Sequence, residues 1–192
     1  ADYVPMLVNG AGLSLALTVD ADVTGDNTNG YDSAATTVGT DNVDVTEDNI
    51  LTIETNLSNA NAPAADRFLV VSPATLASMR KIESARSSLY SGSFGNLRPG
   101  TNDYSSLSPN GNGYIGDYLL FKVYCSNNLE AGSSGKKNAG FQREAIAIAI
   151  QKDTSTVKAM NINDGLFTEW ASFIVYGLKK VKGTFINELD GK

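Results

Sequence analysis

The chain has 192 residues with one cysteine and no histidine, and its formal net charge at pH 7 is −6. A single cysteine excludes an intramolecular disulfide and favours folding in the cytosol, while the lack of histidine removes the usual general base and the commonest metal ligand. The composition therefore disfavours an enzyme, and we expect no catalytic residue, no metal and no cofactor.

Charge is divided unevenly along the chain. Residues 1–66 carry eleven acidic side chains and no basic one, whereas residues 67–192 carry ten acidic and fifteen basic side chains. Complementary poles of this kind favour association with copies of the same chain over nucleic-acid binding. A solvated acidic surface that maintains solubility is the equally weighted alternative.

The N-terminal apolar stretch from Met6 to Val19 is interrupted in sequence. The interruptions are Asn9, Gly10, Gly12 and Ser14. Because a membrane span needs about 20 consecutive apolar residues, we expect no span and no membrane partner. The chain begins at Ala1 without the basic start and hydrophobic run of a signal peptide, which favours a processed or partial chain.

The first sixty residues predict an acidic, loop-rich segment that leads into a short helix. Residues 20–49 are dominated by Asp, Asn, Thr and Gly and predict a loop or a loose β-ribbon. Thr46 is a suitable N-cap for a helix that ends before Pro63. The apolar positions of this helix recur at helical spacing: Ile50, Ile53, Leu57 and Ala60.

The next segment predicts a strand, a helix and a long loop. Residues 67–71 form a short apolar run that is typical of a buried strand. Ser72 followed by Pro73 predicts the start of a helix whose inward positions extend to Leu89. Residues 92–113, rich in Gly, Ser, Asn and Pro, predict a surface loop.

The remaining residues predict strands. Residues 118–125 alternate between apolar and polar side chains, as expected of one half-buried strand. Residues 145–150 alternate Ala with Ile, which predicts a strand with two buriable faces. Residues 173–182 and 184–189 are also rich in β-forming residues. Strands and helices mix without a regular βαβ rhythm, so the predicted class is α+β.

Two motifs match ligand-binding spacings without the context that such sites need. Residues 111–116 have the spacing of a dinucleotide fingerprint, but a strand follows them where a helix is required, so a glycine-rich hairpin entry is favoured. Residues 20–25 resemble the opening of a calcium loop, but Tyr31 occupies the position of the closing glutamate. A plain acidic turn is the favoured interpretation.

Candidate catalytic side chains are few. Cys125 lies on the apolar face of a predicted strand with no base nearby, which favours a core residue over a nucleophile. A glycosidase needs a pair of carboxylates, for example Asp117 with Glu144, but no pair stands out in the sequence. Exposed bases are expected on loops instead, where they would meet phosphates or the acids of a neighbouring subunit. The predicted inter-subunit contacts are Arg98, Lys136 and Lys137.

Three ordered segments resemble the major capsid proteins of tailed bacteriophages: residues 61–73, residues 116–129 and residues 139–147. Residues 176–181 are similar to the final strands of that family. The resemblance covers residues 46–189 and implies the C-terminal part of the capsid fold that tailed phages share with encapsulins and the herpesvirus capsid floor.

The resemblance also implies a division into lobes. Residues 61–139 with 178–192 would form the axial lobe, and residues 140–177 would form the strands of the peripheral lobe. The N-terminal arm, the extended loop and most of the spine helix of the family appear absent, and residues 1–17 would supply at most the end of that helix.

The implied function is a structural subunit of an icosahedral phage capsid shell. Copies would assemble in the host cytoplasm into hexamers and pentamers that enclose double-stranded DNA, with scaffolding, portal and decoration proteins as further partners and non-specific contact with the packaged DNA. An extracellular or tail-associated β-rich binding module is one alternative, and an encapsulin-like compartment shell is another. A carboxylate-based hydrolase is the third-ranked alternative.

Overall fold

The computed structural model describes residues 4–25, 29–31, 36–82, 85, 113–160 and 168–192, and within them the side chains of all but residues 4, 154–160 and 168–170. The helices are α1 (Val4–Thr24), α2 (Glu47–Asn59) and α3 (Pro73–Met79). The strands are β1 (Thr37–Gly39), β2 (Arg67–Val71), β3 (Tyr114–Tyr118), β4 (Phe121–Cys125), β5 (Lys136–Gln142), β6 (Ile146–Met160), β7 (Thr168–Lys180) and β8 (Ile186–Gly191). Two 3-10 helices, η2 (Arg143–Ala145) and η3 (Gly183–Phe185), connect the ribbon of β6 and β7 to the rest of the fold.

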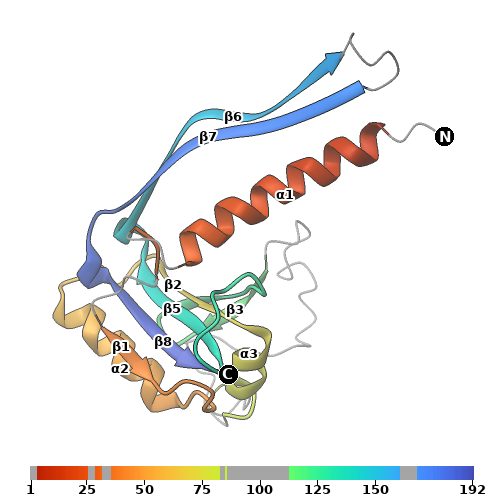
Figure 1. The fold of residues 1–192 in the computed structure, drawn as a ribbon. Helices are drawn as coiled ribbons and strands as arrows, with labels where there is room; N and C mark the ends of the chain where they lie inside the picture. Colours follow the sequence, from red (N-terminus) through yellow and green to blue (C-terminus); the bar gives the residue numbers. More distant parts are fainter. Residues whose placement is uncertain (1–3, 26–28, 32–35, 83–84, 86–112, 161–167) are drawn as a thin grey trace.

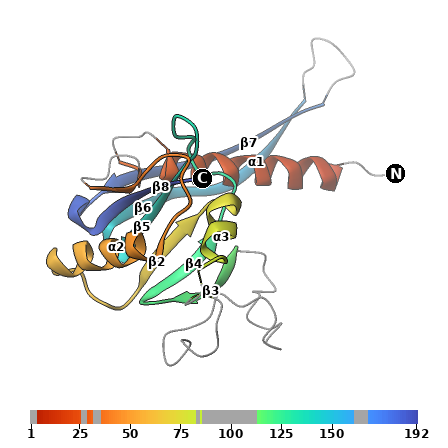
Figure 2. The ribbon, with the colours of Figure 1, turned by 90° about the horizontal axis from the view of Figure 1, so that it is seen from below.

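The body of the fold is a six-stranded sheet in the order β1-β8-β5-β2-β4-β3. The pairs β1–β8 and β2–β4 are parallel, and the other neighbours are antiparallel. Helices α2 and α3 lie against this sheet (Figures 1 and 2). Gly140 of β5 lets α2 approach closely, because a Cβ there would lie 2.7 Å from Cγ2 of Ile53. The core between helices and sheet includes the fully buried Leu69, Val123 and Leu189.

The local signals around α2, β2 and α3 are confirmed. Thr46 caps α2, its Oγ1 accepting a hydrogen bond from Asn49 N–H at 3.4 Å. Ser72 caps α3, its Oγ accepting from Thr75 N–H at 3.0 Å. Helix α3 ends at Met79, so the expected helix is too long: Ile82, expected on its inner side, lies in a bend beyond its end. Leu89 lies outside the described residues, as does most of the predicted loop at 92–113.

Helix α1 differs from the sequence prediction. It is continuous to Thr24, so the first residues of the predicted loop at 20–49 are helical. The family resemblance implied at most the end of a helix within residues 1–17, and the helix is longer than that. A glycine costs a helix about 0.5–1 kcal/mol, too little for Gly10 and Gly12 to end a run of Leu and Ala. By length and composition Pro5–Thr24 is apolar enough to cross a membrane, with an 18-residue window of mean hydropathy 1.2 in which no residue is buried. The core helix of a soluble protein and a signal sequence meet the same criterion. The glycines and polar residues of this stretch therefore do not argue against a membrane span, and its length and composition do not establish one.

The predicted single strand at 118–125 is wrong. The structure contains the antiparallel hairpin β3–β4, and its register shifts between Tyr114 and Gly116. The turn places Leu119 at φ 51°, a conformation that leucine rarely adopts, so no turn-forming residue marks it in the sequence. Tyr118 is buried, although the alternation placed it on the polar face. Strand β3 begins at Tyr114, within residues 111–116, so a strand and not the helix of a dinucleotide site continues from this glycine-rich segment.

A long antiparallel ribbon, β6 with β7, leaves the body beside α1, and both views show the two running in the same direction (Figures 1 and 2). The strands expected at 145–150 and 173–182 are confirmed in this ribbon. Their burial is not, because Ile148 and Ile150 are 48% and 58% exposed in the single chain. The predicted α+β class is confirmed, with the body and the ribbon as separate sheets.

Candidate assembly surfaces

The layer of α1 and the ribbon presents large apolar side chains to solvent. On α1, Met6 and Leu13 are 76% and 62% exposed. On the ribbon, Phe173 and Val175 lie on the face of β7 whose side chains are exposed, and both are more than a third exposed. Extended apolar surface on a single chain marks an interaction site with protein or membrane. This layer is therefore the first candidate assembly surface.

The open face of the six-stranded sheet carries a row of aromatic rings. Phe68 of β2 lies between Phe141 and Tyr124, with ring centroids 5.7 and 6.0 Å away. Tyr31 continues the row from Phe141 at 4.6 Å, and Tyr114 continues it from Tyr124 at 5.4 Å. Burial of Tyr31, with the nearby charge of Asp20 adding to it, raises the pKa of its hydroxyl.

A hollow of about 600 Å³ opens between this aromatic row and the end of α1. Its wall combines aromatic rings with polar groups from the turn after β4, and its lining residues include Asp20, Phe68, Tyr124, Ser126 and Phe141. A mixture of flat apolar rings and a few polar groups is typical of surfaces that bind a partner, either a small molecule or a protein. The hollow is therefore the second candidate assembly surface.

The predicted inter-subunit bases are only partly described by the structure. Arg98 lies outside the described residues. The expectation that Lys136 and Lys137 are exposed on a loop is wrong, because both begin strand β5, are partly buried and make contacts within the chain. The Lys136 Nζ donates to the Leu129 carbonyl oxygen at 2.7 Å, and the Lys137 Nζ lies 3.9 Å from Glu188. An inter-subunit role for these three bases stays a prediction.

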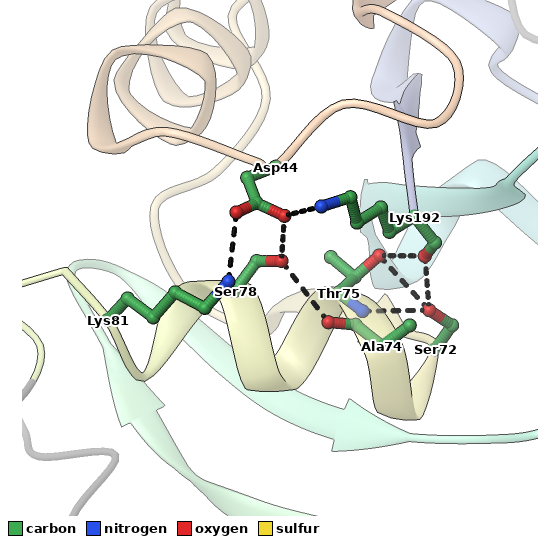
Figure 3. A network of polar contacts seen from close by, with 7 residues as sticks. All are labelled: Asp44, Ser72, Ala74, Thr75, Ser78, Lys81 and Lys192. Atoms are coloured by element: carbon green, nitrogen blue, oxygen red, sulfur yellow. Dashed lines mark hydrogen bonds and ion pairs between the residues drawn. The ribbon is translucent and has the colours of Figure 1, made fainter.

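Several acidic residues of the first third have partners inside the chain. Asp66 lies 3.3 Å from Lys122, and Asp41 accepts backbone N–H groups of residues 134 and 135. Asp44 makes the densest set of contacts (Figure 3). Its oxygens lie 2.9 Å from Lys81 Nζ and 2.7 Å from Lys192 Nζ. The acidic pole is therefore not wholly available to a neighbouring subunit.

The contacts of Asp44 attach the end of the chain to α3. The Ser78 hydroxyl donates to Asp44 at 2.8 Å, and the hydroxyls of Ser72 and Thr75 donate to the carbonyl oxygen of Lys192 at 2.7 and 2.6 Å (Figure 3). Hydrogen bonds from the ammonium groups of Lys192 and Lys81 hold the pKa of the Asp44 carboxyl well below its usual range. A deprotonated Asp44 therefore joins the segment before α2, the helix α3 and the C-terminal residue.

Acid is expected to weaken this attachment. Because the pKa of Asp44 is lower in the folded than in the unfolded chain, its stabilisation is present above the ordinary carboxyl pKa of about 3.9 and is lost as pH falls through the folded-state value. Urea unfolding of the parent and of Asp44→Asn from pH 7 downward should show the parent more stable at neutral pH and the difference shrinking below about pH 4. A difference that is constant across this range would contradict the role assigned to Asp44.

The catalytic and metal candidates are not brought together. Within the described residues, no group of three or more His, Cys, Asp or Glu side chains is placed to hold a metal ion. Residues 20–24, the expected start of a calcium loop, lie on helix α1 and so cannot wrap a cation as a loop does. Asp117 accepts a hydrogen bond from Tyr114, whereas Glu144 pairs with Lys182 at 2.6 Å. Burial raises the pKa of the Cys125 thiol, against the opposing effect of Arg80, which disfavours the thiolate of a nucleophile.

Sequence reasoning missed both candidate surfaces. The exposed apolar side of α1 was not predicted, because its glycines were expected to interrupt the apolar stretch. The aromatic row is built from residues far apart in sequence, and the parallel pairing of β2 with β4 that brings Phe68 near Tyr124 leaves no local signal. Residues 173–175 of β7 are apolar at every position, so the sequence does not show which face of the strand is exposed; the period of two appears only in the exposure of the side chains.

The fold of a sheet-and-helix body with a long ribbon beside a helix is similar to that of several solved structures. A structure from Mycobacterium phage Che8 is similar, with a TM-score of 0.63, 20% identity and coverage of 97% of this chain and 63% of that one. The capsid structure of cyanophage P-SCSP1u aligns at a TM-score of 0.64 and 15% identity, covering all of this chain and 67% of that one. The holo-SrpI encapsulin complex of Synechococcus elongatus PCC 7942 aligns at 0.62 and 12% identity, covering 92% and 61%.

These similarities establish the fold, and the capsid fold implied by the sequence resemblance is confirmed. The chain spans 61 to 67% of the length of these three relatives. No protein-family model matches the sequence, and no curated protein matches it.

Proposed function

We propose that the chain is a structural subunit of an icosahedral phage capsid, which assembles with copies of itself into hexamers and pentamers around double-stranded DNA. The observation that carries the proposal is the capsid fold, because nearly the whole chain aligns with capsid structures. The exposed apolar side chains of α1 and the ribbon support it, since a shell subunit must bury surface against its neighbours. The proposed function resides in these contacts and involves no catalysis.

We propose further that residues 61–139 with 178–192 form the axial lobe and residues 140–177 the peripheral lobe. The separation of the body sheet from the ribbon supports this division, since the two meet at η2 and η3, close to the proposed limits. Scaffolding, portal and decoration proteins, non-specific contact with DNA, assembly in the host cytoplasm and a final place in the virion belong to the same proposal.

The full-length gene product is expected to form closed shells. Electron microscopy and sedimentation of the purified protein, with and without a scaffolding partner, should show particles in place of monomers. If acids of residues 1–66 meet the neighbouring subunit's bases at Arg98, Lys136 and Lys137, added salt should reduce the assembled fraction, because salt screens exposed charges. Monomers alone under every condition would contradict the function, whereas shells insensitive to salt would contradict only the charge contacts.

An encapsulin-like compartment is the second candidate, favoured by the likeness to the SrpI encapsulin complex. The two shells differ in contents rather than in fold. Nuclease treatment followed by analysis of particles purified from the native source distinguishes them, since packaged double-stranded DNA indicates a virus and an enclosed protein without a genome indicates a compartment.

A further inference from the structure

The last two turns of α1 contact both the body and the ribbon. On the body side, α1 meets the turn after β4. The Asn128 Nδ2 donates to the Leu17 carbonyl oxygen at 2.9 Å and to Asp20 at 3.3 Å. The Thr24 hydroxyl donates to the Asn128 carbonyl oxygen at 2.9 Å. Asn128 therefore holds three points of α1, one of them through its main chain.

On the ribbon side, one side chain makes the corresponding contact. The Tyr176 hydroxyl of β7 donates a hydrogen bond to the Asp22 carboxylate, which lies two residues along α1 from both Asp20 and Thr24. This hydrogen bond raises the pKa of the Tyr176 hydroxyl, so the phenol remains a donor at neutral pH. The end of α1 is thus joined through Asn128 to the body and through Tyr176 to the ribbon.

Apart from α1, the described connection between ribbon and body consists of two short segments, whose buried residues Ala145 and Phe185 pack in the core of the body. The ribbon joins the body through the two short helices η2 and η3. There, Val181 N–H donates to the Ala145 carbonyl oxygen at 2.8 Å, and Lys182 pairs with Glu144 at 2.6 Å in an exposed position. Two short connectors side by side leave a ribbon free to swing about the line that joins them, and an exposed ion pair resists such a motion weakly.

We propose that the Leu17–Thr24 end of α1 is the joint that fixes the angle between the ribbon and the six-stranded sheet, with Asn128 and Tyr176 as its two attachment points. A helix that is attached to both the ribbon and the body fixes the angle between them, whereas a helix attached to only one of them does not. If the chain forms a shell, which rests on the proposed function, this angle sets the curvature of the wall. Subunits with a released joint would then assemble into particles of mixed size.

The joint is testable on the unassembled full chain by measuring a distance across it. Two spin labels are placed on exposed sites, at Ala149→Cys of the ribbon and Thr55→Cys of α2, in a chain that carries Cys125→Ser. Pulsed electron paramagnetic resonance should give one narrow distance distribution. Asn128→Ala and Tyr176→Phe, singly and more strongly together, should broaden it, while circular dichroism shows that the variants remain folded.

Two matched controls separate the joint from a general loss of packing. Asn127→Ala removes the same side chain from the exposed neighbour of Asn128, and Tyr114→Phe removes a tyrosine hydroxyl that donates to Asp117 at the far edge of the sheet. Neither should broaden the distribution. An unchanged distribution in the folded Asn128→Ala and Tyr176→Phe variants would overturn the joint. A parent that forms no particles would overturn the proposed function and leave the distance measurement unaffected.

Discussion

Gly135→Ala is expected to destabilise the fold by more than about 3 kcal/mol, at or beyond the upper end of the usual cost of overpacking. Three segments meet at this glycine. A Cβ added there would contact the carbonyl oxygen of Gly191, and it would lie 2.8 Å from both the backbone nitrogen of Asn42 and the Oδ1 of Asp41. Two of these neighbours are backbone atoms, which cannot rotate away as the end of a flexible side chain does. Urea or thermal unfolding of the purified variant measures the loss.

The same substitution elsewhere provides the control. Gly177 lies in β7 on the exposed face of the ribbon, where an added Cβ meets nothing within 4 Å. Gly177→Ala should therefore change the free energy of unfolding by no more than about 0.5 kcal/mol. Equal effects at the two glycines would show that the close approach at Gly135 is not what limits stability.

Arg67→Ala is expected to cost about 2–4 kcal/mol, because it leaves buried acceptors without donors. Arg67 is 2% exposed, and its guanidinium donates to the carbonyl oxygens of Ala62 and Pro63 at 2.8 and 3.0 Å. It also reaches the Ser58 hydroxyl at 3.2 Å. These acceptors belong to the end of α2 and the turn that follows it, so Arg67 fixes the path of the chain from α2 into β2.

Two further variants test whether the directed hydrogen bonds of the buried Arg67 are what stabilises the fold. Arg67→Lys should recover only part of the loss, because one ammonium group cannot replace the planar fork that reaches all three acceptors. Arg143→Ala is the exposed control, since that side chain is 76% exposed and lies 4.0 Å from Asp66, and it should cost less than about 1 kcal/mol. Full rescue by lysine would show that charge, and not the directed hydrogen bonds, is what Arg67 contributes.

Elements with local signals were predictable from the sequence. Thr46 and Ser72 mark helix starts because their hydroxyls accept hydrogen bonds from the first turn, and Pro73 is preorganised for that position. The apolar run of β2, the Ala-Ile alternation at the start of β6 and the β-forming composition of β7 likewise depend only on neighbouring residues. The capsid fold itself was identified by the resemblance of three ordered segments.

The remaining features depend on contacts that neighbouring residues do not reveal. Helix α1 is apolar on its exposed side, which no single-chain core explains, and its glycines therefore misled the prediction. The turn at Leu119 uses a positive φ without glycine or asparagine. The joint at Asn128 joins residues more than 100 positions apart, so an ordinary polar side chain in a turn gives no sign of it.

The place of β8 in the sheet has a consequence for synthesis of the protein. Residues 186–191 lie between β1 and β5, so they provide the neighbour of a strand made near the beginning of the chain and of another made near its middle. While the ribosome is still translating, β1 has no partner and one edge of β5 is open. The sheet is completed only after residue 191 has emerged, since pairings so distant in sequence form late. A chain interrupted during translation before residue 186 would therefore lack a finished six-stranded sheet.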